Sequence, residues 1–202
     1  MAPAANGTHS AGEPGDETLM MAYRDGDASA FDMLYRRHRT WLYRTLARQL
    51  GDASRADEVF QETWYSLIRS APGYEPRARF TTWLYLLARQ RIADHWRRVD
   101  PAEQALTFND DGEASDTDVL DALVDENADP AQHAERHAFA RKLSEGIAQL
   151  PPAQREVLLL ASDAAMSLDE IATATASDRE AVKSRLRYAR QKLALFIKEA
   201  RP

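Results

Sequence analysis

The sequence predicts an all-α protein in which two small helical bundles are joined by a flexible acidic linker. Apolar residues recur at three- and four-residue steps through two stretches, 19–99 and 131–200, and this spacing places side chains on one face of a helix. The alternation of apolar and polar residues that marks strands is missing from the sequence. A run without Lys or Arg, 101–135, separates the two stretches.

Length and composition narrow the class of protein. The 202 residues, with 44% hydrophobic and 29% charged side chains, suffice for one average domain or two small ones. Because the chain has no cysteine, disulfides, zinc ribbons, iron–sulfur clusters and cysteine nucleophiles are excluded. The start of the sequence lacks the features of a signal peptide, and no apolar run approaches the roughly 20 residues of a membrane span. We therefore expect a cytoplasmic protein without membrane insertion.

The charges are segregated along the chain, although the net charge is -6. Residues 1–18, a predicted disordered tail, carry three acidic residues. Residues 19–100 carry fourteen Lys and Arg against ten Asp and Glu, and residues 136–202 carry twelve against eight. The linker, 101–135, carries eleven acidic residues. Two mildly basic domains are suited to binding a polyanion, such as a nucleic acid. The same polyanion would repel the acidic linker between them.

The first domain is expected to contain three long helices. The first covers 31–50 and ends at Gly51-Asp52, and the second covers 56–68. The Pro- and Gly-containing segment 71–76 breaks the second helix, and a third runs over 81–98.

The second domain is expected to end in a helix-turn-helix. A helix from about residue 131 stops before Pro151-Pro152, and another covers 153–163. Ser167 is placed as the N-cap of a short helix, and Ser177 begins a last helix that runs to about residue 200. A short helix, a brief turn and a long basic helix form the layout that inserts its second helix into the major groove.

The last helix has two distinct faces. Its apolar stripe is Val182, Leu186, Ala189, Leu193 and Phe196. An adjoining flank is cationic and consists of Arg179, Lys183, Arg187 and Arg190. Ser184 lies beside this flank. Arginine can pair with guanine through two hydrogen bonds, so this flank favours DNA binding, the alternative being a solvated surface helix.

Two further patterns indicate binding surfaces in the first domain. The helix at 56–68 carries polar residues opposite its apolar stripe, namely Asp57, Glu58, Gln61 and Glu62. Such a face is suited to docking on a basic protein surface, or else it is merely solvated. The segment 74–96 mixes aromatic residues with arginines, a combination that holds single-stranded nucleic acid by stacking and charge, although each ring taken singly is typical of a core.

Catalytic and metal-binding patterns are weak. His133 and His137 stand four residues apart, but zinc needs more ligands than two, so we expect no metal and no cofactor. Because neither a Gly-rich phosphate loop nor a paired-carboxylate or Ser–His set stands out, the sequence does not predict an enzyme.

The chain resembles an extracytoplasmic-function (ECF) sigma factor, a bacterial transcription initiation factor of the sigma-70 family. The resemblance covers about residues 19–99 and 136–199. Its most specific segments are Ala56-Asp57-Glu58-Val59-Phe60-Gln61-Glu62-Thr63-Trp64, Phe80-Thr81-Thr82-Trp83-Leu84-Tyr85, Leu150-Pro151 with Arg155-Glu156-Val157-Leu158, and Val182-Lys183-Ser184-Arg185-Leu186.

The resemblance implies a role for each surface. Sigma domain 2 (19–100) would dock on the beta-prime clamp helices of core RNA polymerase through Asp57, Glu58, Gln61 and Glu62. The same domain would recognise and open the -10 promoter element through Tyr74, Arg77, Arg79, Phe80, Trp83, Arg89 and Gln90. Sigma domain 4 (136–202) would recognise the -35 element through Lys183, Ser184, Arg187 and Tyr188, to which the helical projection adds Arg179 and Arg190.

The implied partners are core RNA polymerase, including its beta subunit, promoter DNA and an anti-sigma factor. The principal alternative is a stand-alone helix-turn-helix repressor that uses the second domain alone, and a metal-dependent hydrolase is a third hypothesis. Ala165 and Ala176 stand where the family commonly has glycine, and Ala181 replaces a usual threonine. If the two alanines need positive φ, each costs about 1 kcal/mol.

Overall fold

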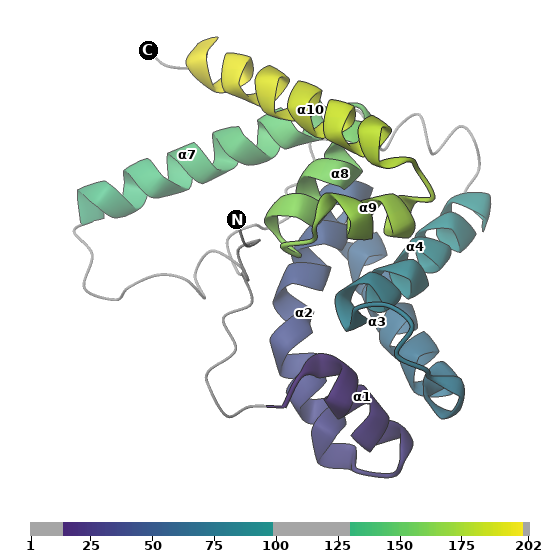
Figure 1. Cartoon of the computed structure of the whole chain (residues 1–202). Coiled ribbons are helices and arrows are strands. Elements are labelled where there is room, and N and C mark those ends of the chain that lie inside the picture. Colours follow the sequence, from purple (N-terminus) through teal and green to yellow (C-terminus); the bar gives the residue numbers. More distant parts are fainter. Residues whose placement is uncertain (1–13, 99–129, 200–202) are drawn as a thin grey trace.

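The computed structural model describes residues 14–98 and 130–199, and every regular element in those ranges is helical. Figure 1 shows the elements in chain order: α1 (Asp16–Arg24), α2 (Ala28–Leu50), α3 (Ala53–Ser70), the 3₁₀ turn η1 (Ala71–Gly73), α4 (Phe80–Arg98), α7 (Pro130–Ala148), α8 (Pro152–Ser162), α9 (Leu168–Thr175) and α10 (Arg179–Glu199).

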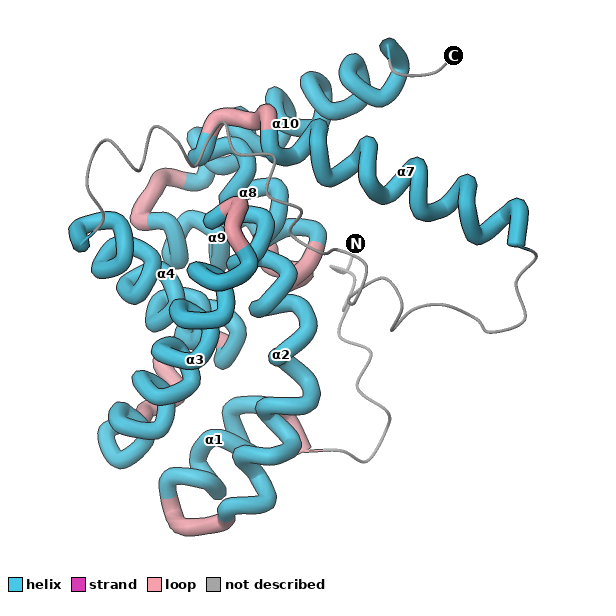
Figure 2. Tube along the Cα trace, turned by 180° about the vertical axis from the view of Figure 1, so that it is seen from behind, coloured by secondary structure: helices cyan, strands magenta, loops and turns pink. Residues whose placement is uncertain are grey.

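The first bundle consists of α1 to α4. Helix α3 packs on both α2 and α4, and α1 packs on α2 at the end of the molecule away from α10 (Figures 1 and 2). The centre is fully buried and mostly leucine: Leu34, Leu42, Leu46, Leu67 and Leu84. Burying each such side chain contributes about 1.5–3 kcal/mol to folding, so this layer holds the helices that carry the predicted surfaces.

Local side chains set the helix ends in the first bundle. Asp27 accepts a hydrogen bond from the Ser29 amide at the start of α2, and Asp52 accepts one from the Arg55 amide at the start of α3. Gly51 ends α2 with a φ of 68°, a conformation that glycine adopts without steric cost. These signals are local, so the sequence locates α2 and α3 well.

The second bundle consists of α7 to α10, with α10 packed on the other three. The Ser167 hydroxyl caps α9 by accepting a hydrogen bond from the Glu170 amide, and the Ser167 amide donates one to the Glu170 carboxylate, which completes a capping box. Arg155 is buried and donates hydrogen bonds to the carbonyl oxygens of Ile147, Ala148 and Leu150, which closes the end of α7. A fourth bond from Arg155 reaches the carbonyl oxygen of Arg48 in α2, at 3.4 Å.

The two alanines that stand where the family commonly has glycine both have positive φ. Ala165 precedes α9 with a φ of 50°, and Ala176 ends α9 with a φ of 51°. Both lie in the left-handed region, where a Cβ approaches the following carbonyl oxygen. The helix-turn-helix therefore forms without the glycines, at a steric cost.

The two bundles contact each other, which the sequence does not predict. Helix α9 packs on α4, and α8 packs on α2 (Figures 1 and 2). Ion pairs between described residues cross this seam and join Arg48 with Asp163 at 3.2 Å, Arg79 with Glu170 at 3.3 Å, and Arg89 with Glu156 at 3.2 Å.

Two helices cross the predicted segment limits. Helix α1 begins at Asp16, inside the predicted tail, and residues 1–13 lie outside the described residues. Most of the predicted linker, 99–129, also lies outside them, and α7 begins at Pro130. The all-helical fold with two bundles is confirmed.

Candidate nucleic-acid and protein interfaces

The acidic face of α3 is on the surface of the first bundle. Asp57, Glu58 and Gln61 are exposed and Glu62 is half-buried, because the opposite stripe of α3 turns inward. That stripe includes Ala56, Val59, Thr63, Trp64 and Leu67. The structure thus brings together the four side chains that the sequence placed on one face.

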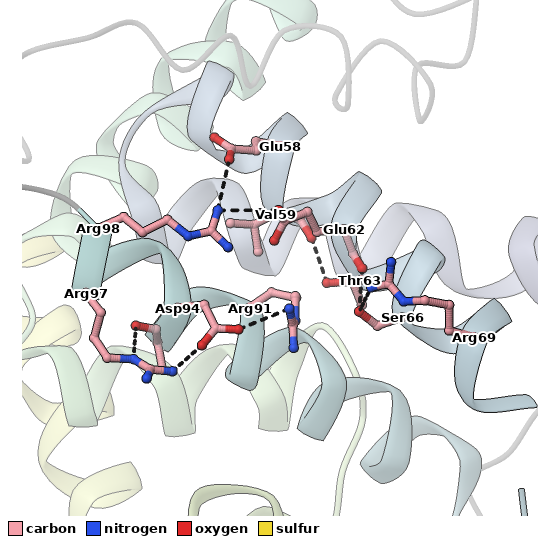
Figure 3. Close-up of polar contacts among 11 residues, drawn as sticks. Glu58, Val59, Glu62, Thr63, Ser66, Arg69, Arg91, Asp94, Arg97 and Arg98 are labelled. Atoms are coloured by element: carbon pink, nitrogen blue, oxygen red, sulfur yellow. Dashed lines mark hydrogen bonds and ion pairs between the residues drawn. The ribbon is translucent and has the colours of Figure 1, made fainter. Parts of the chain in front are cut away.

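Arg98, in the last turn of α4, lies beside this acidic face (Figure 3). Its Nη1 is 3.9 Å from Oε1 of Glu58 and 3.6 Å from Oε1 of Glu62, and Nδ1 of His95 is 4.0 Å from Oε2 of Glu58. The side chains of Arg98 and Glu58 are 60% and 54% exposed. Pairs this long and this exposed are worth little, so the carboxylates remain available to a cationic partner.

Two apolar side chains extend the acidic face toward the end of α3. Tyr65 is 60% exposed and Ile68 is 40% exposed. Tyr65 and Ile68 follow Gln61 at helical spacing, and that signal could have identified them as part of the face.

The segment from Tyr74 to Trp83 contains both buried rings and exposed arginines. Tyr74 is 3% exposed and Phe80 is fully buried. Both rings pack on Trp83, with centroid distances of 4.7 Å and 5.9 Å. Burial, together with the nearby charges of Glu17 and Asp16, raises the pKa of Tyr74 to about 12. In this conformation neither Tyr74 nor Phe80 presents its ring to a base.

The arginines of this segment are on the surface. The side chain of Arg77 is 85% exposed and pairs with Glu75, and that of Arg79 is 55% exposed and pairs with Glu170 of the second bundle. Segment 74–80 therefore combines two exposed cations with two buried aromatic rings.

Arg89 and Gln90 lie further along α4, at the seam. They line an open groove of about 650 Å³ between α4 and α8. Arg89 pairs with Glu156 of α8, whereas Gln90 is exposed. The structure thus places these two residues next to the second bundle and apart from the acidic face of α3.

The predicted DNA-reading face of α10 is open to solvent. Val182, Leu186 and Ala189 are buried, and the adjoining flank is exposed except for the half-buried Ser184. The flank consists of Arg179, Lys183, Ser184, Arg187, Tyr188 and Arg190.

Internal contacts order part of this flank. The Arg187 guanidinium lies 4.9 Å from the centroid of the Tyr188 ring. Arg179 pairs with Asp169 at 3.0 Å, and Lys183 pairs with Glu180 at 3.5 Å. The four side chains of these two ion pairs are more than half exposed, so phosphate oxygens can compete with the carboxylates for the two cations.

The described residues give no support to metal binding or membrane insertion. No three His, Asp or Glu side chains gather there as a metal site would need, and the side chains of His133 and His137 lie outside the described part. In the same residues, no helix has the length and apolar character to cross a membrane.

Comparison with known families matches both bundles. Residues 34–101 match Sigma-70 region 2, and residues 140–193 match Sigma-70, region 4. The RNA polymerase sigma factor CarQ of Myxococcus xanthus is 30% identical over 155 residues, which cover 75% of this chain and 80% of CarQ. The ECF RNA polymerase sigma factor RpoE of Cereibacter sphaeroides is 30% identical over 178 residues, covering 87% and 91%.

Solved structures share the fold. CnrH, in complex with the cytosolic domain of CnrY, has a TM-score of 0.64 at 22% identity and covers 92% of this chain and 99% of CnrH. The sigma factor RpoE in complex with the anti-sigma factor NepR, from Bartonella quintana, has a TM-score of 0.57 at 15% identity and covers 84% and 99%.

Proposed function

This chain belongs to the sigma-70 family as an ECF RNA polymerase sigma factor, which directs RNA polymerase to promoters through regions 2 and 4, and we propose that three surfaces carry that activity. The observation that carries the proposal is that three chemistries lie on different helices: carboxylates on α3, arginines together with aromatic rings at segment 74–80 and α4, and cations on α10. A stand-alone repressor would need only the surface on α10.

The acidic face of α3 docks on the beta-prime clamp helices of core polymerase. Asp57, Glu58, Gln61 and Glu62 supply the polar contacts, and the exposed Tyr65 and Ile68 supply apolar area beside them. Exposed charges steer the encounter and fix the orientation, while buried aromatic and aliphatic contacts slow dissociation.

Segment 74–80 and helix α4 bind the -10 element as it opens. Arg77, Arg79, Arg89 and Gln90 contact the strand together with the half-buried Trp83. Tyr74 and Phe80 act from the interior, since their rings support Trp83 and the backbone of the segment. Stacking and phosphate contacts offset the cost of unpairing, which is a few kcal/mol for a base.

Helix α10 reads the -35 element in the major groove. Arg179, Lys183, Arg187 and Arg190 face the DNA together with Ser184 and Tyr188. The beta subunit of the polymerase is also a partner of the chain. The chain acts in the cytoplasm, where polymerase and promoters are, and an anti-sigma factor is a further partner. The structural neighbour bound to NepR supports that partner, and co-purification from native cells tests it.

Charge reversal on α3 tests the proposal. We expect Asp57→Lys combined with Glu58→Lys to weaken binding to core polymerase at least about tenfold and to abolish run-off transcription. Asp32→Lys is the matched control, because Asp32 is also exposed but lies on α2, and it should bind core as the wild type does. Unchanged core binding by the double variant would overturn the docking assignment. Tight promoter binding by the chain alone, insensitive to the double variant, would favour the repressor.

A further inference from the structure

Segment 74–80 is tied at both ends to α1, a helix distant in sequence. Nη1 of Arg24 donates a hydrogen bond to the carbonyl oxygen of Tyr74 at 3.2 Å, across 50 positions of sequence. The Phe80 amide donates to Oε1 of Glu17 at 2.8 Å, across 63 positions. Helix α1 precedes the residues that match Sigma-70 region 2, which begin at residue 34.

The bond from Phe80 to Glu17 caps helix α4 from outside its own neighbourhood. The residues before Phe80 are Pro76, Arg77, Ala78 and Arg79, and none is of a type that usually caps a helix. The first amides of a helix need acceptors, and a carboxylate at that end is favoured by the helix dipole. The Glu17 side chain supplies both an acceptor for the first amide of α4 and a negative charge at that helix end, so the start of α4 depends on α1.

Helix α1 is itself fixed to α2, so Glu17 is presented from a rigid support. Asp16 accepts a hydrogen bond from Nη1 of Arg37 at 2.8 Å and lies 2.9 Å from Nε2 of His38. The side chains of Asp16 and His38 are 13% and 7% exposed. The His38 ring packs on Phe80 with centroids 4.9 Å apart, so α2 also contacts the residue that Glu17 holds.

We propose that Glu17 and Arg24 are positioning residues, which hold segment 74–80 in the conformation that presents Arg77 and Arg79 to the opened -10 strand. This inference rests on the proposed DNA role of the segment. Glu17 and Arg24 do not themselves contact DNA. Without them the segment samples other conformations, and ordering it on binding costs affinity.

The test uses reconstituted holoenzyme and a labelled single-stranded oligonucleotide. The oligonucleotide carries the non-template -10 sequence of a promoter that the wild-type holoenzyme selects from a random-sequence pool. We expect Glu17→Ala and Arg24→Ala each to weaken oligonucleotide binding about fivefold to tenfold and to leave binding to core within about twofold. Glu17→Gln, which keeps an acceptor oxygen, should lie between the wild type and Glu17→Ala. Thr18→Ala, an exposed change on the same helix, is the control.

Hydrogen exchange gives a local readout in the free chain. In Glu17→Ala the Phe80 amide should exchange faster, while amides in the middle of α2 keep their wild-type rates. If Glu17→Ala fails to fold, Glu17→Gln and Arg24→Ala carry the test.

The Arg77→Ala, Arg79→Ala double variant separates the two ways of failing. If it weakens oligonucleotide binding and the α1 variants do not, the positioning inference is overturned. If neither it nor the α1 variants weaken that binding, the proposed DNA role of the segment is wrong. An equal loss of core and oligonucleotide affinity in the α1 variants would also overturn the inference, because it would indicate general damage to the bundle.

Discussion

The hydroxyl of Tyr85 on α4 donates a hydrogen bond to Oε1 of Glu156 on α8, at 2.9 Å, and so joins region 2 to region 4. The Tyr85 side chain is fully buried, and its hydroxyl also accepts a bond from Nε2 of Gln49 at 2.8 Å. Burial and the charge of Glu156 raise the pKa of Tyr85 well above its ordinary value. The phenol therefore stays protonated and remains a donor at physiological pH.

A double-mutant cycle should detect this bond. Tyr85→Phe and Glu156→Ala should each lower the free energy of unfolding, measured in urea. The loss in the double variant should be smaller than the sum of the two single losses by about 1–2 kcal/mol. The control cycle pairs Tyr85→Phe with Glu145→Ala, an exposed glutamate on α7, and should be additive. Additivity in both cycles would mean that the bond does not stabilise the seam.

The two alanines with positive φ offer sites for stabilisation. Ala165→Gly and Ala176→Gly should each raise the free energy of unfolding by about 0.5–1 kcal/mol, since the relief of the Cβ clash exceeds the added entropy of the unfolded chain. Ala172→Gly, inside α9, is the opposite control and should lower it by about 1 kcal/mol. A lower free energy of unfolding in Ala165→Gly and Ala176→Gly than in the wild type would contradict this expectation.

Stability should depend on pH through Asp16. Although burial opposes ionisation, His38 and Arg37 lower the pKa of Asp16 from 3.8 to about 2. The folded state thus keeps Asp16 ionised at pH values where the unfolded chain is protonated. Its stabilisation is complete above about pH 4 and is lost as the pH falls toward 2.

Acid titration of the unfolding free energy checks this window. Asp16→Asn should remove about 1 kcal/mol at pH 6, after allowance for solvent screening, and should flatten the curve between pH 4 and 2. Asp32→Asn, an exposed carboxylate on α2, is the comparison and should leave the curve nearly unchanged. A curve that stays equally steep in Asp16→Asn would contradict the assignment.

Salt dependence should reveal which lysine on α10 meets phosphate. Lys183→Ala should weaken holoenzyme binding to promoter duplexes of any -35 sequence and reduce the slope of log affinity against log salt by about one. Lys192→Ala is the matched control, because Lys192 is on the same helix but donates to the Gln149 carbonyl oxygen. An unchanged slope for Lys183→Ala would remove Lys183 from the DNA-binding face.

Local signals explain why most helices could be predicted from the sequence. Ser167 and its capping box mark the start of α9, and the buried and charged stripes of α10 repeat with the helical period. The four polar residues of α3 reach the surface for the same reason. At Ala176 the family resemblance marked a position that commonly holds glycine, and the structure gives that alanine a positive φ.

Long-range contacts explain what the sequence left out. The pairing of Arg89 with Glu156 joins residues 67 positions apart, and the cap from Glu17 to Phe80 spans 63. No periodic pattern links such residues. For Tyr74 the sequence left two alternatives open, because an aromatic residue beside arginines fits the pattern whether its ring packs on Trp83 in the core or stacks on a base.

Arg155 donates three hydrogen bonds to carbonyl oxygens at the end of α7, within its own bundle, and one to the carbonyl oxygen of Arg48 in the other bundle. Pulling region 4 away from region 2 would therefore break a single long bond at this residue. The guanidinium would still hold α7 and α8 together, so region 4 could swing outward as one intact body and reach a distant stretch of duplex without refolding.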